Sequence, residues 1–166
     1  MQEESAELVA CIPRLRRYAR ALMLDAAGAD DLVQDTMERA WRRLASWRRG
    51  AAMRPWLFGI MHNLHVDRLR KAGLPTVELD EDMPQPAAAV HDTLELRDLH
   101  AALAALPPGQ REVLLLVALE GMTYEEVAAT LAIPLGTVMS RLSRGREKLR
   151  AAMEGRPVAP PLKVVK

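Results

Sequence analysis

The sequence predicts an all-α protein: two small helical domains joined by a flexible acidic linker, with a helix-turn-helix in the C-terminal domain. Runs of β-favouring residues are isolated, whereas apolar residues recur at the helical period between Gly and Pro breaks. The hydrophobic content of 49% is sufficient to build cores in a chain of 166 residues. We expect domains at residues 1–72 and 94–155, a linker at 73–93 and a loose tail at 156–166.

The distribution of charge supports this division. Residues 1–72 carry 13 Lys/Arg against 9 Asp/Glu, residues 73–96 carry none against 6, and residues 97–166 carry 10 against 7. Two mildly basic blocks therefore flank an acidic connector, although the net charge is only +1. Nucleic acid is a reasonable partner for the basic blocks and not for the connector.

The N-terminal block contains three helical patterns. The first covers residues 5–24, where Pro13 either kinks or restarts the helix. A turn is expected at 25–29. A second helix over 29–46 follows, with Asp30 and Asp31 near its positive end. The third helix covers 53–71 and has Pro55 in its first turn. The apolar positions expected to face the core are Leu8, Ile12, Leu15, Ala19 and Leu22; Leu32, Thr36, Trp41 and Leu44; and Trp56, Leu57, Ile60, Met61, Leu64 and Leu69.

The connector holds three prolines and four acidic residues between Glu78 and Asp82. Proline limits helix and the charges repel one another, so an extended or disordered segment is predicted. These acidic side chains fit a soluble spacer.

The C-terminal block contains four helical patterns. The first two, over 94–106 and 110–119, are stopped by Pro107-Pro108-Gly109 and by Glu120-Gly121. Thr123 and Glu126 have the spacing of a capping box for a helix over 124–131. After the turn at 132–135, the last helix runs to about residue 153.

The last helix has two distinct faces. Val138, Leu142 and Leu149 share one side, with Gly145 between them, and can pack on the preceding helix. Gly145 costs the helix about 1 kcal/mol relative to Ala, and close packing is the reason we find for it. The opposite side gathers hydroxyls and cations suited to phosphates and base edges: Thr137, Ser140, Arg141, Arg144 and Lys148. For this helix alone, an ordinary solvated basic face is the competing interpretation.

Other functional classes find little support. The one cysteine, Cys11, cannot form an internal disulfide, which fits a reducing compartment. Neither a signal peptide at the first residues nor an apolar run of membrane-spanning length is present, so a cytoplasmic protein without membrane insertion is expected. His62 and His65 are three residues apart but lack further ligands of suitable spacing. No Gly-rich phosphate loop or nucleophile elbow occurs, so we predict neither an enzyme nor a cofactor.

Several segments occur in an order that resembles the extracytoplasmic-function class of bacterial RNA polymerase sigma factors, over about residues 8–152. They are, in chain order, Asp30-Asp31-Leu32-Val33-Gln34-Asp35-Thr36; Arg54-Pro55-Trp56-Leu57-Phe58-Gly59-Ile60 with Asn63 and Asp67-Arg68; Leu106-Pro107 with Gln110-Arg111-Glu112-Val113; Glu120-Gly121 with Tyr124-Glu125-Glu126-Val127-Ala128; and Gly136-Thr137-Val138 with Ser140-Arg141. The resemblance implies that regions two and four are the two domains. It also implies a non-catalytic subunit that binds core RNA polymerase, directs it to promoter DNA and is controlled by an anti-sigma factor.

The resemblance assigns three sets of residues. The minus-thirty-five element would be read by Thr137, Ser140, Arg141 and Arg144, with Arg146 and Lys148 nearer the phosphates. The minus-ten element would be held by Arg48, Arg49, Arg54, Trp56, Asn63 and Arg68. A tryptophan such as Trp56 is more often a core residue with a mainly structural role. Core polymerase would dock on Asp31, Gln34, Asp35 and Glu38. Helix-dipole stabilisation with solubility is the competing explanation, and it accounts for Asp30 and Asp31 better than for Gln34 and Asp35. The resemblance also implies that the acidic linker side chains mimic RNA charge, with the soluble spacer as the alternative.

Two other functions fit parts of the chain. An ordinary helix-turn-helix regulator would bind a palindromic operator by itself, commonly as a dimer. A sigma-factor mimic would only titrate an inhibitor. The mimic has no need of Arg141 and Arg144, and the regulator has no need of the helix over 53–71.

Overall fold

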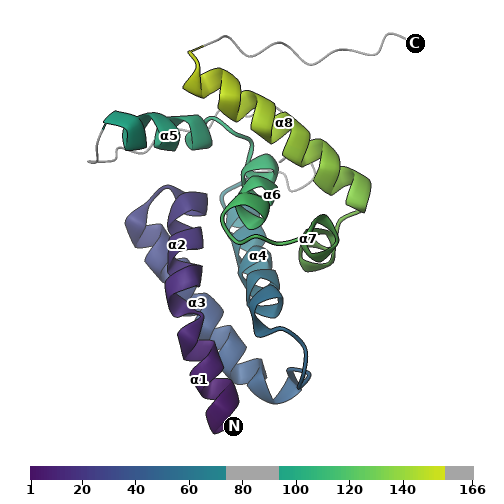
Figure 1. The fold of residues 1–166 in the computed structure, drawn as a ribbon. Helices are drawn as coiled ribbons and strands as arrows, with labels where there is room; N and C mark the ends of the chain where they lie inside the picture. Colours follow the sequence, from purple (N-terminus) through teal and green to yellow (C-terminus); the bar gives the residue numbers. More distant parts are fainter. Residues whose placement is uncertain (74–93, 156–166) are drawn as a thin grey trace.

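The computed structural model describes residues 1–73 and 94–155, and these form helices without strands (Figure 1). The N-terminal part contains α1 (Gln2–Ala10), α2 (Ile12–Met23), α3 (Ala26–Arg43), the short 3₁₀ helix η1 (Leu44–Ser46) and α4 (Met53–Lys71). The C-terminal part contains α5 (Leu94–Ala104), α6 (Pro108–Ala118), α7 (Tyr124–Leu131) and α8 (Leu135–Met153). The predicted all-α fold is thus confirmed. The predicted linker, apart from Gly73, and the predicted tail lie outside the described residues.

The start of the chain departs from the predicted single helix. The helix is interrupted at Cys11, and Pro13 lies in the first turn of α2, so the proline restarts the helix. The turn expected at 25–29 is also wrong, because Asp25 is the N-cap of α3 and accepts a hydrogen bond from the Gly28 amide at 3.0 Å. A Cβ at Gly28 would lie 2.7 Å from the Asp25 carboxylate oxygen, so glycine leaves room for this cap.

The N-terminal core lies where α2, α3 and α4 pack together. Leu15, Leu32 and Leu57 are fully buried there. Tyr18 and Phe58 meet edge to face, with ring centroids 4.9 Å apart. Trp41 was expected in this core, but it is 57% exposed. It follows Leu32 by nine residues, about two and a half helical turns, and so lies on the opposite side of α3.

The C-terminal domain is organised by α8, which packs against α5, α6 and α7 (Figure 1). The predicted capping box is confirmed: the Thr123 hydroxyl accepts from the Glu126 amide, and the Glu126 carboxylate accepts from the Thr123 amide. Val138, Leu142 and Gly145 are buried on the inner face of α8, as predicted. A Cβ at Gly145 would lie 3.4 Å from the Gln110 carbonyl oxygen, so the close packing expected of this glycine is contact with α6.

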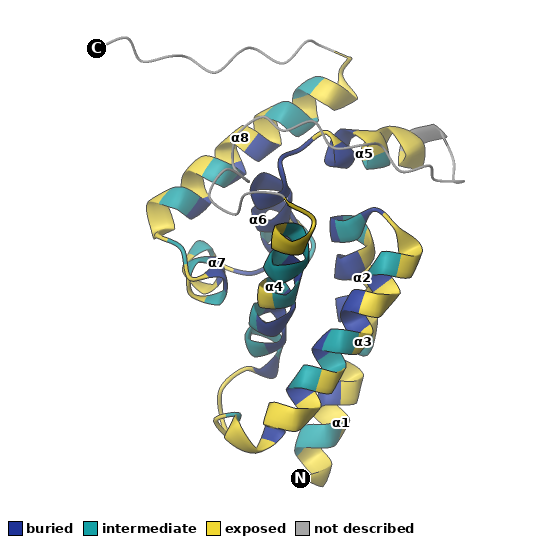
Figure 2. Ribbon diagram, turned by 180° about the vertical axis from the view of Figure 1, so that it is seen from behind, coloured by how far each residue is buried: buried dark blue, intermediate teal, exposed yellow. Residues whose placement is uncertain are grey.

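The two helical parts touch one another. Helix α6 packs on α2, and α7 packs on α4, so buried residues continue from one part to the other (Figure 2). Across this boundary, a Cβ at Gly59 of α4 would lie 3.6 Å from the Thr130 carbonyl oxygen of α7. No helix in the described ranges is long and apolar enough to cross a membrane.

Candidate nucleic-acid interface

The outer face of α8 carries the candidate minus-thirty-five residues. Ser140, Arg144 and Arg146 are exposed, while Thr137 and Lys148 are half-buried. The Ser140 hydroxyl donates to the Thr137 carbonyl at 3.3 Å. Val138 and Leu142 are fixed in the core, so the helix has one rotational setting and presents Thr137, Ser140, Arg144 and Lys148 on its opposite side. Arg146 is exposed on another side of the helix, because it follows Arg144 by only two residues. The geometry suits an element that enters a groove.

Arg141 lies differently from its neighbours on α8. Its side chain extends over Gly109, where an added Cβ would lie 3.3 Å from Nη1. Its charge also acts to lower the pKa of His62 on α4, which places it near the domain boundary. The structure therefore positions Arg141 between the candidate DNA surface and the contact between the domains.

The candidate minus-ten residues lie on the loop between η1 and α4 and along α4 itself. Arg48 and Arg49 are exposed on this loop, and Gly50 adopts a φ of +89° that favours glycine. Trp56 packs near Trp47, with ring centroids 6.5 Å apart, which fits a mainly structural role. On α4, Arg54 is half-buried and Asn63 is exposed.

One contact at this loop was not anticipated from the sequence. Glu4 of α1 forms an ion pair with Arg49, with 3.1 Å between Oε1 and Nε, and its side chain is only 16% exposed. Glu4 is one of several N-terminal acidic residues, and no local pattern distinguishes it from Glu3 or Glu7.

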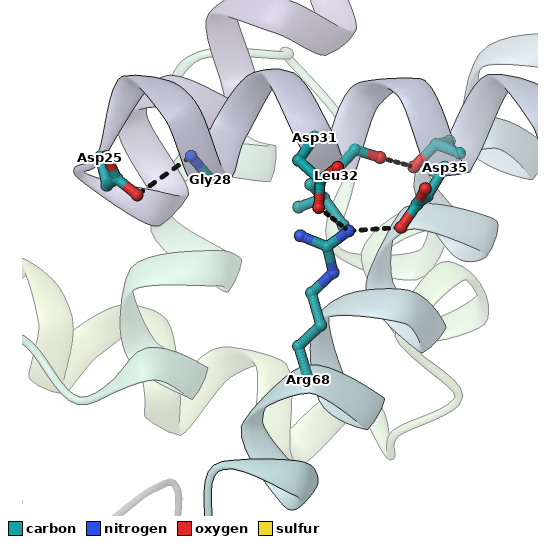
Figure 3. Close-up of polar contacts among 7 residues, drawn as sticks. Asp25, Gly28, Asp31, Leu32, Asp35 and Arg68 are labelled. Atoms are coloured by element: carbon teal, nitrogen blue, oxygen red, sulfur yellow. Dashed lines mark hydrogen bonds and ion pairs between the residues drawn. The ribbon is translucent and has the colours of Figure 1, made fainter.

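A second cluster brings together residues that the family resemblance assigns to two different surfaces. Arg68 Nη2 lies 3.0 Å from Asp31 Oδ2 and 2.5 Å from Asp35 Oδ2 (Figure 3). Arg68 belongs to the candidate minus-ten set, whereas Asp31 and Asp35 belong to the candidate polymerase set. Gln34 and Glu38 are exposed on the same helix, and Glu38 pairs with Arg42 at 3.8 Å.

Arg111 of α6 is the main polar group within the C-terminal domain and at its boundary. Its guanidinium donates to the carbonyls of Leu103, Ala104 and Leu106 at 2.8, 3.3 and 2.9 Å, and to that of Leu22 in α2 at 3.0 Å. The carbonyls of Leu103 and Ala104 lie at the end of α5, where helical acceptors are left over, and that of Leu106 lies in the segment that follows. Burial lowers the pKa of Arg111 to about 10, so the group stays charged at neutral pH.

A histidine pair faces α6 from α4. His62 Nδ1 lies 2.6 Å from Glu112 Oε1. Burial alone would lower the pKa of His62, but the hydrogen bond and the charge of Glu112 raise it above its ordinary value. His65 is buried, neither of its ring nitrogens has a hydrogen-bond partner among the described residues, and burial lowers its pKa. Neither histidine belongs to a cluster of three metal-ligating residues within the described ranges.

A buried carboxylate completes the boundary. The Glu120 side chain has no exposed surface and lies 3.8 Å from Arg14 and 3.5 Å from Arg17, both on α2. Arg17 also donates to the Leu119 carbonyl at 3.4 Å. Arg111, Glu112 and Glu120 had been noted in the sequence as parts of motifs without roles; their signal was charge within otherwise apolar helical runs.

Comparison with known proteins now decides the family. The family model "Sigma-70, region 4" matches residues 96–149, and "Sigma2 domain of PhyR" matches residues 8–62. The ECF RNA polymerase sigma factor EcfG of Rhodopseudomonas palustris (strain TIE-1) is 38% identical over 152 residues, covering 89% of this chain and 83% of the relative. The chain is an extracytoplasmic-function RNA polymerase sigma factor.

Two further relatives extend the comparison. The ECF sigma factor SigE of Mycolicibacterium smegmatis is 39% identical, over 82% of this sigma factor and 56% of the relative. The sigma factor RpoE of Bartonella quintana, solved in complex with the anti-sigma factor NepR, matches with a TM-score of 0.79 and 34% identity, over 93% of this chain and 98% of that one. Membership identifies a transcription regulator rather than a catalyst.

A weaker likeness bears on the fold alone. The anti-anti-sigma factor PhyR of Bartonella quintana, solved in complex with NepR, matches with a TM-score of 0.60 and 19% identity over 48% of its chain. The helical architecture is therefore shared with an anti-anti-sigma factor.

Proposed function

We propose that this sigma factor binds core RNA polymerase and directs it to promoters through three separate surfaces, with residues 1–72 acting as region two and 94–155 as region four. The outer face of α8 reads the minus-thirty-five element, because its cations are exposed while its apolar face is fixed. Arg144 is the residue we assign most directly to base edges, since an arginine can bind guanine with two hydrogen bonds. Thr137, Ser140 and Arg141 complete this surface, with Arg146 and Lys148 on the phosphates.

The N-terminal domain contributes the other two surfaces. The loop at 47–52 and α4 hold the minus-ten strand, where Arg48, Arg49 and Arg54 supply cations and Asn63 an amide. The exposed polar side of α3, with Asp31, Gln34, Asp35 and Glu38, docks on a basic surface of core polymerase. As a polymerase subunit, the protein acts in the cytoplasm.

Two promoter elements cannot be occupied while the domains remain packed together. Elements near minus ten and minus thirty-five are about 25 base pairs apart, which at about 3.4 Å per pair is roughly 85 Å. A compact body of 135 residues has a radius of gyration near 14 Å and is roughly 40 Å across. The domains must therefore separate during initiation, and an anti-sigma factor such as the NepR bound to the Bartonella relative would act by opposing separation.

Reconstituted transcription tests this function. The purified chain with core polymerase should give promoter-specific transcripts that neither component gives alone. Arg144→Ala should weaken promoters that depend on the minus-thirty-five element and leave core binding intact. Arg150→Ala, an exposed cation at the end of the same helix outside the proposed surface, is the matched control. Equal losses in the two variants would contradict a specific reading role.

The alternative function is that of a sigma-factor mimic, because residues 8–62 match the Sigma2 domain of PhyR. A mimic of that kind would bind an anti-sigma factor and give no transcript with core polymerase. A transcript from the reconstituted system would exclude pure mimicry, whereas anti-sigma binding without a transcript would establish it.

A further inference from the structure

The ion-pair cluster at Arg68 joins two surfaces that the proposed function keeps apart. Arg68 reaches from α4 toward α3, where one nitrogen, Nη2, contacts both Asp31 and Asp35 (Figure 3). The arginine side chain is 27% exposed, whereas the two carboxylates are 66% and 44% exposed. The cation is therefore the inner member of the cluster, and the carboxylates retain surface open to a partner.

Charge limits what this cluster can bind in the free chain. One guanidinium faces two carboxylates, so the cluster carries a net negative charge. An approaching phosphate meets Arg68 together with the repulsion of Asp31 and Asp35, which disfavours contact. A cationic protein surface meets the opposite situation, because both carboxylates are accessible and only partly compensated.

We propose that polymerase docking frees Arg68 for DNA: in the free chain Asp31 and Asp35 hold the arginine, and polymerase cations that pair with these carboxylates release it to a phosphate of the minus-ten strand. This rests on the proposed function, since it uses the same docking and DNA surfaces. Coupling of this kind is reciprocal, so strand binding at Arg68 also strengthens polymerase docking. This exchange makes the minus-ten surface bind DNA weakly in the free subunit and tightly in the assembled polymerase.

The test measures binding of the full chain, without polymerase, to a single-stranded minus-ten oligonucleotide over a range of salt. Asp31→Asn/Asp35→Asn should raise affinity roughly two- to tenfold, the scale of two partly exposed ion pairs. The salt dependence should steepen by about 0.7 in logarithmic slope, as for one added phosphate contact on a single strand. Adding Arg68→Ala to this variant should abolish both gains.

Asp30→Asn is the matched control, because Asp30 precedes Asp31 on α3 but pairs with Arg16 and Arg20, at 3.9 and 3.7 Å. Asp30→Asn removes one negative charge, as the single variant Asp35→Asn does, but it leaves the contacts of Arg68 unchanged. An equal gain in both single variants, or a gain that survives Arg68→Ala, would overturn the proposal.

The assembled enzyme supplies the second arm. At saturating core polymerase, wild type and Asp31→Asn/Asp35→Asn should bind the oligonucleotide equally, because docking has already engaged the carboxylates. A persistent gain would show that the carboxylates still hold Arg68 there, which refutes the exchange. If wild-type enzyme transcribes promoters but the free double variant shows no gain, the proposed function stands and the exchange fails; if wild type gives no transcripts, both fail.

Discussion

Replacing Arg111 with methionine should destabilise the protein more than any exposed arginine substitution. Methionine keeps much of the aliphatic stem but removes the guanidinium, so four carbonyls lose a donor: those of Leu103, Ala104, Leu106 and Leu22. The residue is 3% exposed, so water cannot replace these bonds without rearrangement. Each hydrogen bond to a charged group contributes about 1.5–3 kcal/mol, but the terms do not add, because removing the charge also removes its desolvation cost. A buried acceptor left without a donor costs about 1–3 kcal/mol, and because the four carbonyls can relax in part we expect a total loss of about 3–5 kcal/mol.

Urea unfolding followed by circular dichroism measures this loss. Arg111→Lys should give an intermediate value, because a single ammonium cannot span carbonyls that the planar guanidinium reaches together. Arg42→Met is the control: Arg42 is 78% exposed and pairs with the exposed Glu38 at 3.8 Å, so its loss should stay below about 1 kcal/mol. If Arg111→Met cost no more than Arg42→Met, the four carbonyl contacts would not be contributing as the structure indicates.

Four further predictions concern stability. The raised pKa of His62 means that its contribution is fully present below about pH 6.5 and is lost as pH rises through the folded pKa, so His62→Gln should remove the alkaline decline of the unfolding free energy. The lowered pKa of His65 acts in the opposite direction, since only the unfolded chain protonates readily near pH 6.5. His65→Leu should therefore remove the decline of the unfolding free energy toward acid pH. Urea unfolding between about pH 5.5 and 8 checks both histidine predictions. Thr123→Ala should cost about 1 kcal/mol by breaking the capping box, which thermal unfolding would show, whereas a change of a few tenths would contradict the cap. Gly145→Ala should be close to neutral, because a helix gain of about 1 kcal/mol offsets tightening against Gln110, while Gly145→Leu should cost about 1–3 kcal/mol in the same assay.

Local signals predicted the helices where they were unambiguous. The third N-terminal helix was placed at 53–71 and the helix before the recognition helix at 124–131, both as observed. The capping box at Thr123 was clear because both of its side chains are local in sequence. Pro13 was compatible with either a kink or a restart, and a tertiary setting was needed to decide between them. The segment 25–29 is predicted as a turn, whereas in the fold the Gly28 amide completes the cap on Asp25.

Local sequence patterns do not predict which distant residues pair with one another. Arg68 was assigned to DNA and Asp35 to polymerase because each occurs in its own motif, and nothing local says that 33 residues of separation close into one contact. Arg111 shows the same limit, since its fourth acceptor, Leu22, is 89 residues away. A charged residue within an apolar helical run signals burial with a partner, but the partner's identity depends on topology.

Polar contacts within the C-terminal domain are stronger than those across the boundary between the domains. Three of the four Arg111 bonds lie within the C-terminal domain and persist when the domains part. Glu120 is fully buried, whereas the cations nearest to it, Arg14 and Arg17, are 51% and 56% exposed and lie 3.8 and 3.5 Å away, so they offset its desolvation only in part. The charge pairing of Glu112 with His62 requires a protonated imidazole, so this contact weakens as pH rises. Separation of the domains lets water solvate Glu112 and Glu120, which offsets part of the lost contact. The polar contacts across the boundary therefore give way at a lower cost than the Arg111 contacts within the C-terminal domain, which suits the proposed separation of the domains.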